Sequence, residues 1–143
     1  MDMDEMDQRL LSLLRINSRA TTSSLARELG VSRSTVQDRI SRLERRNVIA
    51  GYTVRYHEDF GGRLLKAHVM IQVSPKHSVQ IVAELSNIAA VKTLQTVSGI
   101  YDLVTMVEAV TTQEMDGVLD TIGQLPGVEK TTTSIVLTTK FER

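Results

Sequence analysis

The sequence predicts an α+β protein made of two modules, a small helical one followed by a larger one in which strands and helices alternate. Three observations lead to this prediction. Apolar residues recur at helical spacing over roughly the first third of the chain. Further along, apolar β-branched runs of strand length are separated by two helix-like segments. The basic residues also change, from 11 arginines and no lysine in residues 1–65 to five lysines and one arginine in residues 66–143.

The composition excludes several kinds of site. The chain has 143 residues, of which 41% are hydrophobic and 24% are charged, as is typical of a globular protein. It has no cysteine, which excludes disulfides, thiolate metal sites and a cysteine nucleophile. The acidic start lacks the basic region of a signal peptide, and no apolar run approaches the ~18 residues of a membrane span. We therefore expect a soluble cytoplasmic protein with no membrane partner.

The formal net charge of zero conceals a strongly basic segment. Residues 15–55 contain nine arginines against three acidic residues, which is an excess of six positive charges. The distribution of charge, rather than its total, decides which partners a surface attracts. The first module can therefore still bind a polyanion such as DNA.

The first predicted module, residues 1–56, contains three helices. Each has a candidate N-cap, which in chain order is Asp2 or Asp4, Thr21 or Thr22, and Ser32. Gly30 is placed to end the second helix, because glycine adopts the left-handed conformation at little cost. The third helix runs from about Arg33 to Asn47, and its apolar stripe is formed by Val36, Ile40 and Leu43.

A short helix, a turn with glycine and a second helix with a polar face make up the helix-turn-helix pattern. In that motif the second helix enters the major groove of DNA, and its first residues meet the base edges. Arg33 and Gln37 carry donors for base edges, short hydroxyls allow close approach, and the arginines from Arg39 onward can hold phosphates. The candidate DNA-binding residues are Ser32, Arg33, Ser34, Thr35, Gln37, Asp38, Arg39, Ser41, Arg42 and Arg45.

An ordinary solvated helix is the alternative interpretation of this segment. Its arginines would then pair with Asp38 and Glu44 at i, i+4 spacing. The preceding helix, the glycine turn and the local excess of positive charge together favour DNA binding.

The segment after the third helix is expected to complete the first module. Tyr52, Val54 and Tyr56 alternate with polar residues, which predicts a half-buried strand and a winged-helix-like unit. The stretch HEDFGGR, residues 57–63, is polar and contains two adjacent glycines, so residues 57–65 are predicted to be a linker.

The second predicted module, residues 66–143, has the order β-α-β-β-α-β, which is typical of a ferredoxin-like fold with a four-stranded antiparallel sheet. Its last strand is expected over residues 128–140. The strand LVTMV is apolar on both sides, so we expect a second subunit on the open face of the sheet and at least a dimer. The first helix of this module is expected to bury Val79, Val82, Ala83 and Leu85.

Three stretches resemble those of the Lrp/AsnC (feast/famine) transcriptional regulators. They are LARELGVSRSTVQDRISRLERRNVIAGY in the first module, and VSGIYDLV and LPGVEKTTTSIVL in the second. The resemblance covers nearly the whole chain in order. It implies a bacterial or archaeal regulator that binds double-stranded DNA and forms a homodimer, which assembles further to an octamer or similar. It also implies an amino-acid ligand between dimers, as in many members, and no other cofactor.

The resemblance further implies an effector-binding region made of Gly99, Tyr101, Asp102, Thr131 and Thr133. The residue chemistry is compatible with this, because N–H groups around Gly99 can take a carboxylate and Asp102 can accept from an ammonium group. Most of these residues also have a purely structural interpretation. Gly99 can be a hairpin glycine, Asp102 can cap the turn, and the threonines can be present only for their strand propensity.

Three functions are weighed on these grounds. The first is a sequence-specific transcriptional regulator whose amino-acid effector, bound at the dimer–dimer interface, favours one assembly. The second is a DNA-wrapping architectural protein that has no effector. An enzyme is not expected, because His68 and His77 stand alone and no spacing suggests a nucleophile–base pair or a set of metal ligands.

Overall fold

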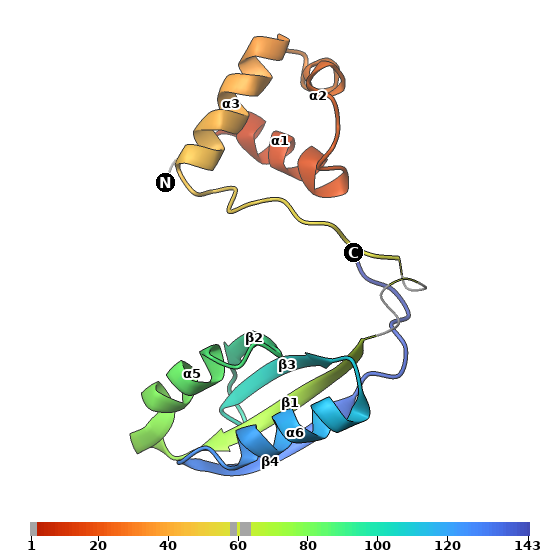
Figure 1. Cartoon of the computed structure of the whole chain (residues 1–143). Helices are drawn as coiled ribbons and strands as arrows, with labels where there is room; N and C mark the ends of the chain where they lie inside the picture. The colour runs from red at the N-terminus through yellow and green to blue at the C-terminus, as the bar shows by residue number, and fades with distance from the viewer. Residues whose placement is uncertain (1–2, 58–59, 61–63) are drawn as a thin grey trace. The chain divides into compact units, whose positions relative to one another are not determined.

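The computed structural model divides the chain into two compact units, Met1–Arg55 and Tyr56–Arg143 (Figure 1). The structure describes residues 3–57, 60 and 64–143. The predicted linker, residues 57–65, falls in part on residues 58–59 and 61–63, which lie outside the described residues. The two units are considered separately below.

The first unit consists of three helices, α1 (Glu5–Ile16), α2 (Thr22–Leu29) and α3 (Arg33–Arg45). Each begins at a predicted cap, because the side chains of Asp4, Thr21 and Ser32 accept from the backbone N–H three residues later. Gly30 ends α2 in the left-handed conformation, with a φ of 70°. Apolar residues of all three helices form one core, which includes Leu10, Leu14, Leu25, Leu29, Val36 and Leu43.

The strand predicted around Tyr52, Val54 and Tyr56 is not formed. These side chains are 55%, 73% and 69% exposed, and their segment has no regular secondary structure. The alternating pattern is present in the sequence, but a strand also needs a neighbour to pair with. The sheet in the described part of the chain contains only the four strands of the second unit. The prediction of a strand here, and with it the winged extension, is therefore wrong for the single chain.

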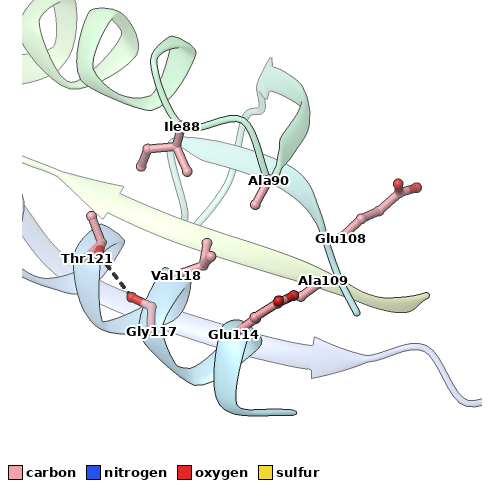
Figure 2. Close-up of a pocket in the computed structure, with 8 residues that line it drawn as sticks. All are labelled: Ile88, Ala90, Glu108, Ala109, Glu114, Gly117, Val118 and Thr121. Atoms are coloured by element: carbon pink, nitrogen blue, oxygen red, sulfur yellow. Dashed lines mark hydrogen bonds between the residues drawn. The ribbon is translucent and has the colours of Figure 1, made fainter. Parts of the chain in front are cut away.

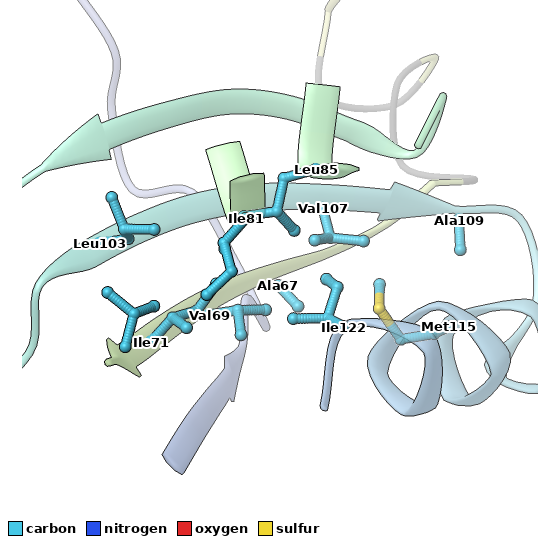
Figure 3. Packing of buried hydrophobic residues seen from close by; sticks show 11 residues of the cluster. Ala67, Val69, Ile71, Ile81, Leu85, Leu103, Val107, Ala109, Met115 and Ile122 are labelled. Atoms are coloured by element: carbon cyan, nitrogen blue, oxygen red, sulfur yellow. The ribbon is translucent and has the colours of Figure 1, made fainter. Parts of the chain in front are cut away.

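The second unit has the predicted ferredoxin-like order. Its elements are β1 (Leu65–Val73), the 3₁₀ turn η1 (Pro75–His77), α5 (Ser78–Ser86), β2 (Val91–Thr96), β3 (Leu103–Ala109), α6 (Thr112–Gly123) and β4 (Val128–Ile135). The strand order is β2-β3-β1-β4, and all neighbouring strands are antiparallel. Both helices cover the same face of the sheet (Figures 1 and 3). Neither of the α-helices described in this unit, α5 and α6, covers the other face.

The core of the second unit lies between the sheet and these two helices. Alternate residues of the central strands point toward the helices, as strand geometry requires. Figure 3 shows them meeting side chains from α5 and α6. The residues at the centre of this contact are Val69, Ile71, Leu103, Val107, Ile81, Leu85, Met115 and Ile122.

The buried side of α5 agrees with the predicted one only at Leu85. Ile81 and Leu85 are buried, whereas Val79 is 85% exposed, Val82 is 40% exposed and Ala83 is exposed. The helix carries two overlapping apolar stripes, and helical spacing alone does not choose between them. The sheet makes the choice, because the stripe with the larger side chains buries more apolar surface against it.

The last strand is shorter than predicted and ends at Ile135 rather than at residue 140. One further hydrogen bond, from the Val136 N–H to the Lys66 carbonyl oxygen at 2.8 Å, continues the pairing. Since β1 begins at Leu65, the described part of this strand offers no further backbone for the following residues to pair with. Strand propensity without a partner does not make a strand.

Candidate functional site

One side of α3 is exposed and carries most of the residues predicted to bind DNA. The opposite side holds the helix in place, because Val36 and Leu43 are completely buried in the three-helix core. The orientation of α3 about its own axis is therefore determined by packing. The predicted DNA-binding residues that are exposed are Ser32, Arg33, Ser34, Gln37, Asp38, Ser41 and Arg45.

Hydroxyl groups tie the first turn of α3 together. The Oγ atom of Ser32 accepts from the Thr35 N–H at 3.2 Å. It also lies 3.0 Å from the Oγ atom of Ser34 and 2.8 Å from the Oγ1 atom of Thr35. The positive end of the helix dipole and the Arg33 side chain are at the same end of α3. This end is therefore suited to approach a polyanion closely.

Two of the predicted phosphate-binding residues, Arg39 and Arg42, instead contact the start of α1. The Nη1 atom of Arg39 lies 2.7 Å from Asp4 Oδ2 and 2.7 Å from Asp7 Oδ1. The Nη2 atom of Arg42 lies 3.1 Å from Asp7 Oδ2 and 3.2 Å from Asp7 Oδ1. The acids that hold these arginines thus come from another helix, and not from Asp38 as the alternative interpretation supposed. We call Asp4, Asp7, Arg39 and Arg42 the α1–α3 ion-pair cluster.

The cluster changes the electrostatics of the first unit. The hydrogen bond from Arg39 lowers the pKa of Asp4, and the hydrogen bond from the Asp7 N–H lowers it further. The same contacts, with Asp4 first and Asp7 second, raise the pKa of Arg39. Two carboxylates here oppose two guanidinium groups. Once Asp4 and Asp7 are counted with residues 15–55, the excess of positive charge falls from six to four.

Sequence reasoning missed Asp7, although a pattern could have pointed to it. Asp7, Leu10 and Leu14 follow one another at helical spacing, and all three are buried. An acidic residue within an apolar stripe must find a cationic or hydrogen-bonding partner when the helix packs.

In the second unit, Gly99 and Tyr101 lie in and after the turn that joins β2 to β3. Gly99 has a φ of 141°, a conformation that side-chain-bearing residues rarely adopt. The Tyr101 hydroxyl forms a hydrogen bond with the Thr132 hydroxyl on β4. Thr132 is paired with Met70, so this contact lies on the open face of the sheet.

The predicted threonines of β4 are not brought together with Tyr101. The register pairs Thr131 with Ile71 and Thr133 with Val69, and both partners point toward the helices. Directly paired residues share a face, so Thr131 and Thr133 point away from the face that carries the Tyr101–Thr132 contact. A shift of one position along β4 thus replaces the predicted pair with Thr132.

Asp102 is used within the backbone of its own unit. Its Oδ2 atom accepts from the Val73 N–H at 2.8 Å. This N–H lies at the irregularity in the β1–β4 register between Gln72 and Val73. The carboxylate therefore satisfies a backbone donor where the ladder is interrupted, which is close to the structural role weighed for it beside the ligand role.

The open face of the sheet is apolar at its centre. As predicted for the third strand, Leu103 and Val107 are buried on the helix side, while Val104 and Met106 point to the open side. Met70 of β1 is paired with Val104 and adds to the same patch. These three open-face side chains are only half-buried in the single chain.

A shallow cavity of about 330 Å³ lies between α6 and the segment that enters β2 (Figure 2). Its acidic groups are already engaged, since Glu114 Oε2 accepts from the Val110 N–H at 2.9 Å and Glu108 lies 3.9 Å from Lys66 Nζ. No predicted effector residue lines this cavity, whose walls are Ile88, Ala90, Glu108, Ala109, Glu114, Gly117, Val118 and Thr121. Across the described residues, no group of three or more acidic or histidine side chains could hold a metal ion.

A helix-turn-helix unit followed by a ferredoxin-like unit defines a DNA-binding regulator that carries a separate ligand-binding domain. Family models match both parts of the chain. The AsnC-type helix-turn-helix domain covers residues 3–44, and the Lrp/AsnC ligand binding domain covers residues 66–143. The chain belongs to the Lrp/AsnC family of transcriptional regulators.

Similar proteins agree with this assignment. The chain is 33% identical over 140 residues to the HTH-type transcriptional regulator LrpA of Mycobacterium tuberculosis, which covers 97% of this chain and 93% of that protein. It is 31% identical over 141 residues to the HTH-type transcriptional regulator LysM of Sulfurisphaera tokodaii, covering 98% of this chain and 99% of that protein. These relatives are named as regulators rather than as enzymes.

Solved structures share the whole architecture. The feast or famine regulatory protein from M. tuberculosis complexed with L-methionine is 32% identical, with a TM-score of 0.86 over 99% of this chain and 96% of that one. The AsnC protein of E. coli shares the fold at 23% identity, with a TM-score of 0.86 over 100% of this chain and 97% of that one. None of the helices described in this chain is long and apolar enough to cross a membrane.

Proposed function

We propose that this protein is a sequence-specific regulator of transcription that responds to an amino acid, with α3 as the helix that reads DNA. The exposed side of α3 supports this proposal, because the buried Val36 and Leu43 hold Arg33, Gln37 and Arg45 outward. Arg33 and Gln37 read base edges, and Arg45 binds a phosphate. Such a regulator works in the cytoplasm, where the DNA of a bacterium or archaeon lies.

A second copy of the chain covers the open face of the sheet in this proposal. Val104, Met106 and Met70 form an apolar centre there, which is half-exposed in one chain. Pairing of two such faces gives a symmetric dimer with two α3 helices, one for each half-site of an operator. Further contacts between dimers give an octamer or a similar assembly.

The amino acid binds at the interface between dimers. The complex of the M. tuberculosis relative with L-methionine supports a ligand of this class. Within one chain, Gly99 and Tyr101 lie near each other in sequence, and Thr132 joins Tyr101 by a hydrogen bond. Since Asp102 serves Val73 and the other threonines face the helices, we infer that another subunit supplies the rest of the site.

A thermal-shift screen of the full chain against the twenty amino acids tests the effector. A ligand that binds the native state raises the melting temperature, and the rise grows with the logarithm of the ratio of ligand concentration to Kd. We expect one or a few amino acids to raise it, and the same ones to change the sedimentation coefficient and the DNA footprint. An unchanged melting temperature, assembly and footprint across all twenty would reject the effector.

An architectural protein that wraps DNA without an effector is the second candidate. It is favoured by the finding that the five predicted effector residues do not form a single shell within the chain. This candidate predicts a long footprint with little sequence preference and a steep dependence of affinity on salt. A short footprint that an amino acid alters would decide for the regulator.

A further inference from the structure

Asp7 is a buried carboxylate that DNA reading by α3 does not explain. Its side chain is 2% exposed, in the first turn of α1, and both of its oxygens contact guanidinium groups of α3. Arg39 is 20% exposed and is shared between Asp7 and Asp4. The cluster therefore lies at the border between the three-helix core and the surface of the unit.

The arginines of the cluster are directed toward α1 rather than toward the exposed side of α3. The Nη1 atom of Arg39 is within 2.8 Å of three carboxylate oxygens, from Asp4 and Asp7. The Nη2 atom of Arg42 is shared by the two oxygens of Asp7, and its Nε atom is buried with no hydrogen-bond partner among the described residues. An arginine aimed at a phosphate would instead present these donors to solvent.

We propose that Asp7, together with Asp4, is a positioning residue that limits sequence-independent DNA binding, because it holds Arg39 and Arg42 away from the phosphates of DNA. This proposal rests on the proposed role of α3 in DNA binding. Each guanidinium group that neutralises a phosphate strengthens binding to every sequence alike. Keeping two of them on α1 therefore lowers the affinity for selected and random DNA alike, and leaves discrimination to the residues that meet base edges.

The contacts explain why phosphates do not capture these arginines. Asp7 is preorganised by the helix and lies in a region with little water, where an ion pair is weakly screened. A phosphate at the protein surface is surrounded by water and salt, and its attraction is screened over about 8 Å at physiological ionic strength. The buried carboxylate therefore competes successfully for the same guanidinium groups.

The test compares the salt dependence of DNA binding by the full chain and by Asp7→Asn. The probes are a fluorescein-labelled random-sequence duplex and the duplex recovered from a random pool by repeated selection on the wild-type chain. Glu5→Gln is the matched control, because Glu5 is exposed, lies in the same helical turn and loses the same charge. Melting curves of each variant check that it is folded.

We expect Asp7→Asn to steepen the slope of log K against log salt by between one and two, since each new phosphate contact contributes about 0.9. Affinity for the random duplex should rise about 5- to 10-fold per contact near 0.1 M salt. Affinity for the selected duplex should rise by a similar factor, so the ratio of the two affinities should stay as it is in the wild-type chain. Glu5→Gln should leave the slope as it is. A folded Asp7→Asn chain with the wild-type slope would overturn the proposal.

Arg39→Gln keeps the proposal testable if Asp7→Asn does not fold. Arg39→Gln should leave the slope of the wild-type chain unchanged, whereas Arg45→Gln, on the exposed side of α3, should lower it by about one. An equal loss of slope in both variants would overturn the proposal. A wild-type chain that binds neither duplex would instead reject the proposed function, so the two failures are distinguishable.

Discussion

The exposed side of α3 and the turn around Gly99 differ in how much of the molecule is needed to build them. The first is made by consecutive residues of one helix, with a cap at Ser32 and an apolar stripe that turns the polar side outward. The second involves the start of β3, a residue of β4 and a backbone donor of β1, which are far apart in the chain. Its composition therefore depends on strand register.

Because of this difference, substitutions in the two regions are expected to have different effects. A change on the exposed side of α3 removes a proposed contact to DNA and leaves the three-helix core intact, because Val36 and Leu43 stay in place. A change near Gly99 alters backbone pairing together with the proposed ligand contacts, since Asp102 accepts a hydrogen bond from β1 directly. The second kind of site is also the one that we propose to be completed by another subunit.

The largest expected effect concerns the open face of the sheet, which we propose is covered by a second copy of the chain. Met106→Glu places a carboxylate on the apolar centre of this face, and an uncompensated buried charge costs about 3–5 kcal/mol. We expect the dimer to dissociate at least about 100-fold more readily in sedimentation experiments. Val79→Glu, on the exposed side of α5, is the control and should leave the assembly unchanged. A Met106→Glu chain that dimerises as the wild type does would show that the interface lies elsewhere.

The next largest effect concerns the exposed side of α3. Arg33→Ala should weaken binding to the selected duplex by about 1–3 kcal/mol, which is the typical worth of a contact to a base edge. Binding to a random duplex should change much less, as fluorescence anisotropy titrations with both duplexes would show. Arg45→Ala should weaken both duplexes alike, because a phosphate contact carries no sequence information. If Arg33→Ala weakened binding to both duplexes equally, Arg33 would not read a base edge, and other residues of α3 would have to do so.

Features set by neighbouring residues were predictable from the sequence. Three helix caps, the left-handed Gly30 and the apolar stripe of α3 each depend on a few consecutive positions, and the structure confirms them. The ferredoxin-like order of the second unit was predictable as well, because each strand and helix has its own period. Local chemistry and periodicity were therefore sufficient to predict the fold class.

Features that depend on distant partners were not predictable in the same way. Arg39 and Arg42 are more than thirty positions away from the acids that hold them, so their charge suggested solvent or phosphate instead. Thr132, rather than its neighbours, meets Tyr101 because of a register that no single strand contains. The segment around Val54 alternates like a strand, yet forms none, since no strand among the described residues pairs with it.

A smaller effect is expected at the proposed effector region, where the strand register places Thr132 rather than Thr133 beside Tyr101. Thr132→Val removes the hydroxyl that bonds Tyr101, and loss of one hydrogen bond of this kind costs about 1 kcal/mol. We expect the amino acid found by the thermal-shift screen to bind about fivefold more weakly to this variant in calorimetric titrations. Thr133→Val, one position along the same strand, should bind it as the wild type does. The opposite order of the two effects would restore the residues first predicted for this region.

The smallest expected effect is a pH dependence within the α1–α3 ion-pair cluster. Asp4 has a lowered pKa in the folded chain, chiefly because of Arg39, so the unfolded chain takes up its proton first as the pH falls. The stabilisation is therefore complete above about pH 5, and is lost as the pH falls past 3.8 and through the lower folded pKa. Asp4→Asn keeps a good N-cap but has no charge to titrate. In urea unfolding followed by amide NMR signals of α1 and α3, the stability difference between wild type and Asp4→Asn should shrink on acidification. A difference that stays constant from pH 6 to pH 3 would mean that Asp4 stabilises the start of α1 as a cap alone.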